Sequence, residues 1–253
     1  AAAETTGSVT RTADRPGSYT LEAIRELRLL REISAVAVEE DGHTLLADSG
    51  VLGTVVRIDA AGRVVETMEL AGEGFGPLSI AGLAHRDEQL FVLNGLNGTV
   101  RIYSNAGVPQ GVIQLPTLAD RLLRGLFIPE EAMSFLIGAP GRILEMSANG
   151  EPIAVHPIPA WSVPGSISGG SGVDSLLVFE PRRSALMFLN NDFASGRVLY
   201  QLHRSAPRFR PNAAAGFEHE QDSFIVAGSG EPTVVYSQPL AAPPSAARHW
   251  RSY

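Results

Sequence analysis

The chain has 253 residues, of which 44% are hydrophobic, and a formal net charge of -7 at neutral pH. This length and apolar content suffice for one substantial core, whereas the negative charge disfavours binding to nucleic acids and to anionic membrane surfaces. Every basic residue is arginine and no cysteine is present, which excludes lysine-based catalysis, thiol nucleophiles and thiolate metal sites.

The chain starts with Ala1-Ala2-Ala3 and stays polar as far as Gly17. Cleavage of a secretory signal after small residues would leave such a start, so we expect a periplasmic or secreted protein, although a trimmed chain would look the same. We expect a flexible segment over 1–18, one folded domain over 19–240 and a tail over 241–253. No run reaches the roughly 20 apolar residues that span a bilayer, so we expect no transmembrane segment.

Residues 33–70 alternate short aliphatic runs with turn residues. The runs 35–38, 44–48, 54–59 and 63–65 are rich in Val, Leu and Ile, and Gly, Asp and Ser lie between them. Runs of this length and composition favour β-strands over helices. The segment therefore predicts four successive strands.

The same order of four strands recurs along the chain, at 80–115, 125–158, 175–203 and 215–236. The glycines that precede the fourth strand recur about 45 residues apart, which is the spacing of one propeller blade. They are Gly62, Gly107, Gly150 and Gly196. The sequence thus predicts an all-β fold, a β-propeller of four-stranded antiparallel blades with five visible repeats and five or six blades.

The last repeat lacks a convincing fourth strand, because the prolines that follow it, Pro239, Pro243 and Pro244, cannot donate ladder hydrogen bonds. We expect the segment 19–30 to fill this position, so that strands from both ends of the chain close the ring. Two alternatives remain open. The spacing of Leu21, Ile24, Leu27 and Leu30 also suits a helix, and the two ends could instead form a degenerate sixth blade.

The residues 72–77, Gly-Glu-Gly-Phe-Gly-Pro, precede the second repeat and its runs 80–83, 90–92 and 97–103. This part of the chain resembles the NHL repeat and related six-bladed propellers. The resemblance implies the fold and leaves the function open, because that group includes interaction scaffolds as well as lactonases, lyases and amidating enzymes.

The loops between the second and third strands, and those between blades, are expected to share the face at the mouth of the central channel. They carry five candidate partner-binding arginines, Arg182, Arg183, Arg204, Arg208 and Arg210. Guanidinium groups suit carboxylates and phosphates, although an exposed arginine loop is also often only solvated. The candidate aromatic anchors are Phe75, Trp161 and Trp250, which are equally consistent with covering the core.

No catalytic set of residues is predicted. The serines Ser168 and Ser171 lack the glycines of a nucleophile elbow, and the six histidines do not converge by repeat position. The alternative is a divalent-cation site at Asp48, Asn94 and Glu180, which follow the second strands of three repeats, while Gly138 and Gly228 lie nearby in two others. Such residues more often cap loops, so no cofactor is expected.

These patterns favour a non-enzymatic extracytoplasmic propeller that binds another protein, as an accessory or scaffold subunit of a larger membrane-associated complex. The alternative is a propeller enzyme of the lactonase or lyase kind, with a polar axial pocket and a divalent cation. A third interpretation, small-ligand or glycan sensing, would require an aromatic-lined mouth.

Overall fold

The computed structural model describes residues 22–27, 33–39, 41–48, 53–70, 79–116, 123–129, 133–158, 164–169, 175–181, 185–190, 196–201, 210–216, 223–229 and 233–239. Within these ranges it contains twenty β-strands and no helix, which confirms the all-β prediction.

The strands form five antiparallel sheets of four strands each. Sheet 1 contains β2 (Ile33–Val38), β3 (Thr44–Asp48), β4 (Thr54–Ile58) and β5 (Val64–Glu69). Sheet 2 contains β6 (Ile80–Arg86), β7 (Gln89–Asn94), β8 (Thr99–Ser104) and β9 (Pro109–Gln114). Sheet 3 contains β10 (Arg124–Phe127), β11 (Ser134–Ala139), β12 (Arg142–Ser147) and β13 (Pro152–Pro157).

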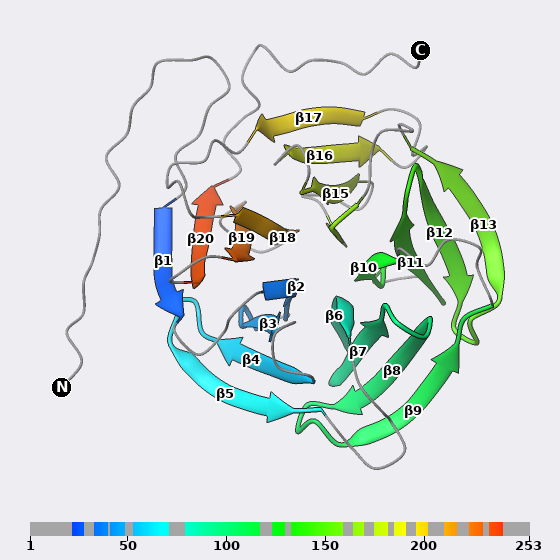
Figure 1. Ribbon diagram of the computed structural model, residues 1–253, viewed down its shortest axis with the longest axis horizontal. Coiled ribbons are helices and arrows are strands. Elements are labelled where there is room, and N and C mark those ends of the chain that lie inside the picture. The colour runs from blue at the N-terminus through cyan, green and yellow to red at the C-terminus, as the bar shows by residue number, and fades with distance from the viewer. Residues whose placement is uncertain are drawn as a thin grey trace.

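Sheet 4 contains β14 (Ser166–Gly169), β15 (Ser175–Glu180), β16 (Ala185–Asn190) and β17 (Gly196–Gln201). Sheet 5 contains β18 (Arg210–Gly216), β19 (Ser223–Ser229), β20 (Thr233–Pro239) and β1 (Glu22–Leu27). The sheets stand around a common centre as the blades of a β-propeller, with the first strand of each innermost and the fourth on the rim (Figure 1).

The outer strand of sheet 5 comes from the start of the chain. Strand β1 pairs antiparallel with β20, in a register that places Glu22 opposite Ser237 and Leu27 opposite Thr233. Sheet 5 therefore contains strands from both ends of the chain, and the helical alternative for this segment is wrong. The innermost strands contact one another in the order β2, β6, β10, β14, β18 and back to β2.

The core lies between neighbouring sheets. One cluster joins Leu45 and Val55 of sheet 1 to Leu83 and Tyr103 of sheet 2, and equivalent clusters join sheet 2 to sheet 3 and sheet 3 to sheet 4. Sheets 2 and 3 each contribute to two of these clusters, so both of their faces are apolar and packing against two neighbours removes both faces from water.

The inner strands of sheets 2, 3 and 4 lie so close together that their backbones leave no room for a side chain at two positions. A Cβ on Gly82 of β6 would lie 2.7 Å from Leu126 N of β10, and a Cβ on Gly125 of β10 would lie 2.7 Å from Ile167 N of β14. Both positions therefore require glycine, because real Cβ atoms do not come so close to backbone atoms.

Three of the four predicted turn glycines join the third and fourth strands of their sheets. Gly62, Gly107 and Gly150 have φ of 75°, 74° and 84°, and each amide donates a hydrogen bond to the carbonyl oxygen three residues earlier. Gly196 differs, because it is the first residue of β17 and pairs with Leu189. The part of the chain that the structure describes holds no helix long and apolar enough to cross a bilayer.

Candidate functional site

The predicted partner-binding residues fall largely outside the described residues. Seven of them lie there, namely Arg182, Arg183, Arg204, Arg208, Phe75, Trp161 and Trp250. The eighth, Arg210, is the first residue of β18, and only its backbone is described. The arginine-rich face therefore stays a prediction.

The alternative cation ligands are described. Asp48, Asn94 and Glu180 are the last residues of β3, β7 and β15, and their exposed fractions are 1%, 0% and 0%. Each makes polar contacts within the protein. A Cβ at the neighbouring position of sheet 3, Gly138, would lie 2.5 Å from Arg124 O, so no side chain fits there. Three sheets thus contribute buried polar groups and sheet 3 contributes none at this position.

Asn94 acts as a loop cap. Its Oδ1 accepts a hydrogen bond of 2.9 Å from Leu96 N, and its carbonyl oxygen accepts one of 3.1 Å from Gly98 N. These bonds fix the loop between β7 and β8, which is the usual role of an asparagine at such a position.

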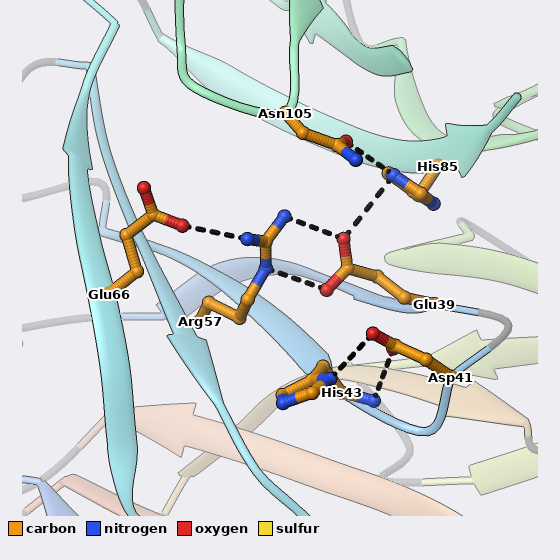
Figure 2. A network of polar contacts seen from close by, with 7 residues as sticks. All are labelled: Glu39, Asp41, His43, Arg57, Glu66, His85 and Asn105. Carbon is orange, nitrogen blue, oxygen red and sulfur yellow. Dashed lines mark hydrogen bonds and ion pairs between the residues drawn. The ribbon is translucent and has the colours of Figure 1, made fainter. Parts of the chain in front are cut away.

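The most extensive polar cluster among the described residues lies between sheets 1 and 2 (Figure 2). Glu39, directly after β2, binds Arg57 of β4 through both carboxylate oxygens, with Oε2 2.7 Å from Nε and Oε1 2.8 Å from an η nitrogen. The other η nitrogen of Arg57 donates to Glu66 Oε2 of β5 at 2.7 Å. The side chains of Glu39 and Arg57 are only 4% and 16% exposed. The hydrogen bond from the η nitrogen of Arg57 to Glu39 Oε1 is charge-assisted, which is one of the stronger kinds of polar contact in proteins.

The cluster continues into sheet 2 through His85 of β6. Its Nε2 lies 2.7 Å from Asn105 Oδ1 and 3.3 Å from Glu39 Oε1, so the contacts favour the tautomer that carries its proton on Nε2. Nδ1 of His85 is buried without a hydrogen-bond partner among the described residues. The side chains from two neighbouring blades therefore form one network, with the carboxylate of Glu39 at its centre (Figure 2).

A turn beside this network brings together Glu39, Asp41 and His43, whose ligand atoms lie within 4.8 Å of one another. A metal ion there would need the oxygens of Glu39, both of which bind Arg57. The geometry therefore suits an ion-pair network better than a metal centre.

The Asp41 carboxylate is held within its own turn. Its Oδ1 accepts a hydrogen bond of 3.0 Å from His43 N, and its Oδ2 lies 2.8 Å from His43 Nδ1. Partial burial alone would raise the pKa of Asp41, but the hydrogen bonds and positive charge of His43, with a smaller contribution from Arg57, hold that pKa below its usual range.

We expect His43→Ala to move the pKa of Asp41 upward, toward that of a free aspartate, because the side-chain contact with His43 is lost. A lowered folded-state pKa stabilises the fold above the unfolded-state pKa, and this contribution is lost as the pH falls through the folded-state value. Carboxyl-carbon NMR titration of both proteins measures the shift. An unchanged pKa in the variant would contradict the assignment to this contact.

A second feature lies on the rim. Five aliphatic side chains on the outer strands of sheets 1 to 3, or in the turn that precedes one of them, are more than half exposed. They are Val65, Val108, Val112, Ile153 and Val155, and we call them the rim belt. The outer strands run one after another around the perimeter, so the belt follows the edge of the disc (Figure 1).

The sequence interpretation missed both features. Counting outward from the turn that ends at Gly62 would place Arg57 opposite Val65, and a bulge between Arg57 and Ile58 shifts the pairing to Glu66, so this pair could not be read from the spacing alone. The contact of Glu39 with His85 joins different sheets, and no spacing along the chain encodes it. The belt could have been found by comparing fourth strands across the repeats.

Comparison with known proteins supports the fold. No family model and no curated protein matches the chain. Among solved structures, a glutaminyl cyclase from Myxococcus xanthus has a TM-score of 0.64 at 12% identity, covering 88% of this chain and 98% of that one. A structure of streptogramin B lyase has a TM-score of 0.52 at 12% identity, covering 87% and 97%. The fold is a β-propeller.

The WD40 propeller domain of Doa1 also matches, with a TM-score of 0.50 at 10% identity, covering 81% of this chain and 78% of that one. Structures titled as two enzymes and as a WD40 propeller domain thus share this architecture. At these identities the likeness shows the fold alone.

Proposed function

We propose that this chain is a non-enzymatic, extracytoplasmic propeller that binds another protein, as an accessory or scaffold subunit of a membrane-associated complex. The rim belt carries the proposal, since its five side chains are each 52% to 59% exposed and recur on three consecutive blades. Single exposed aliphatic residues are ordinary, but a succession along one edge is typical of interaction surfaces.

The described polar clusters support this interpretation. Arg57 of the interblade network is held by two carboxylates. On sheet 3, Glu145 binds both Ser134 and His156, so the carboxylate lies between the other two groups. A hydrolytic triad needs the histidine in that central place, next to the serine. These groups are therefore arranged to stabilise the blades.

Substitutions in the belt test the proposal. We expect Val108→Glu with Val112→Glu, both on the β8–β9 hairpin side of the rim, to abolish stoichiometric co-purification with the partner while the protein stays folded. Leu96→Glu is the matched control, because Leu96 is 68% exposed and lies in the loop between β7 and β8. The measurement is affinity isolation of each variant from gently extracted native source material. Mass spectrometry of the intact complex then shows whether the partner is bound. Equal recovery of the partner by the rim variant and wild type would contradict the proposal.

The location outside the cytoplasm is proposed on the sequence expectation above. Cell fractionation tests it independently of the partner.

A second candidate function is an enzyme of the lactonase or lyase kind. Buried Asp48, Asn94 and Glu180 at the ends of second strands favour it. Structures titled glutaminyl cyclase and streptogramin B lyase show that this fold is compatible with an enzyme. A tightly bound divalent ion in the natively purified protein would favour this candidate over the first.

A further inference from the structure

The five outer strands differ in charge. Strand β1 carries Glu22, Arg25 and Glu26, strand β5 carries Glu66 and Glu69, and strand β17 carries Arg197, whereas β9 and β13 have no Asp, Glu, Lys or Arg. Charged residues on an outer strand discourage edge-to-edge pairing with another chain. Two edges of the rim therefore lack this protection.

Strand β13 is the more apolar of the two. It reads Pro-Ile-Ala-Val-His-Pro, and Ile153 and Val155 are 57% and 59% exposed. The prolines at its ends limit pairing to the residues between them. Strand β9 instead carries Gln110 and Gln114 beside Val112.

The free edge of β13 presents the backbone of Val155. Ile158 N donates to Gly141 O, and the register places His156 opposite Ile143 and Val155 opposite Leu144. Hydrogen-bonded pairs alternate with non-hydrogen-bonded pairs along an antiparallel ladder, and Ile158 forms a hydrogen-bonded pair with Gly141. The backbone N–H and C=O of His156 therefore point toward β12, whereas those of Val155 point away from the sheet. Strand β13 is the last strand of its sheet, so among the described residues these two groups form an open edge.

We propose that β13 pairs with β13 of a second copy of this chain, antiparallel and about a two-fold axis through Val155. In this arrangement each Val155 N–H donates to the other Val155 C=O. Ile153 of each copy lies across from Pro157 of the other, and because Pro157 has no N–H to donate to Ile153 C=O, the two hydrogen bonds between the Val155 residues carry the backbone pairing. The inference rests on the proposed function, because both treat the rim as an interface. It names a second copy of the chain as the partner of β13.

Charge favours a second copy as the occupant. Each copy carries a net charge of -7, so most of their surfaces repel one another, but this edge brings no like charges together. His156, the titratable residue of the strand, is paired with Glu145 of its own sheet at 2.9 Å. An antiparallel pair of identical strands is also self-complementary, as a two-fold interface requires.

Sedimentation velocity over a range of protein concentrations tests the pairing. We expect a reversible dimer for the wild type and at least about tenfold weaker dimerisation for Val155→Glu, since like charges directly opposite each other destabilise a strand pair. Val65→Glu is the control, because Val65 has the same side chain and similar exposure, 56%, on the charged edge of β5. Circular dichroism spectra and melting temperatures should match across the three proteins.

A mixture tests the register. Val155→Glu and Val155→Arg should each dimerise more weakly alone than they pair with each other in a mixture, because the two-fold axis places position 155 opposite itself. A monomeric wild type, a Val155→Glu protein that dimerises as tightly as the wild type, or a mixture that forms no heterodimer would each overturn the inference. A monomeric wild type that retains its heterologous partner through Val112 would leave the proposed function standing.

Discussion

Replacing Gly125 with alanine should lower the free energy of unfolding by about 3 kcal/mol or more, since left-handed backbone strain and overpacking each cost of order 1 to 3 kcal/mol. Gly125 has a φ of 71°, which side chains with a Cβ resist. The added Cβ would also lie 2.7 Å from Ile167 N and 2.9 Å from Ser166 C. These are backbone atoms of β14 in the next blade, so relief requires the inner strands to move apart.

Gly42→Ala separates strain from crowding. Gly42 has a φ of 84°, but a Cβ there would meet nothing within 4 Å. We expect this variant to lose only about 1 kcal/mol, the cost of the backbone conformation. Urea unfolding of both variants gives the comparison. Equal losses would show that close packing at the centre contributes little.

The second large effect is expected for Arg57→Met, which leaves the Glu39 carboxylate buried beside His85 without its cation. Removing one partner of a buried ion pair costs about 3 kcal/mol or more. The side chain of Glu39 is 4% exposed, so water cannot replace the lost contact. The double variant Arg57→Met with Glu39→Gln should recover much of the stability, because it removes the unpaired charge as well.

An exposed pair provides the control for this experiment. Arg63 binds Asp59 at 2.7 Å, but its side chain is 76% exposed. We expect Arg63→Met to leave the urea midpoint nearly unchanged, since solvent screens such pairs. If Arg57→Met were as mild as Arg63→Met, the network between sheets 1 and 2 would not be a major source of stability.

Local patterns predicted the blades well. The runs between 33 and 70 became β2 to β5, and Gly62, Gly107 and Gly150 occupy the predicted turns. These strands and turns each depend on residues that are adjacent in the chain. The spacing of apolar residues around Leu27 suited a helix, but the segment forms a strand. The reason is the topology of the sheet, because β20 needed an outer neighbour.

Contacts between blades were harder to predict. His85 meets Glu39 only because two sheets pack side by side, and Gly82 and Gly125 are required only because inner strands crowd together. The rim belt was missed for a similar reason. The runs that include Val112 and Val155 were expected to be strands, and their exposure follows from lying fourth in the sheet, where blades diverge.

Native mass spectrometry with elemental analysis, on protein gently extracted from its own source, tests the proposed function most directly. We predict a stoichiometric complex with a different protein and no bound divalent ion. A free chain that carries a tightly bound divalent ion would contradict the protein-binding proposal and direct attention to Asp48, Asn94 and Glu180.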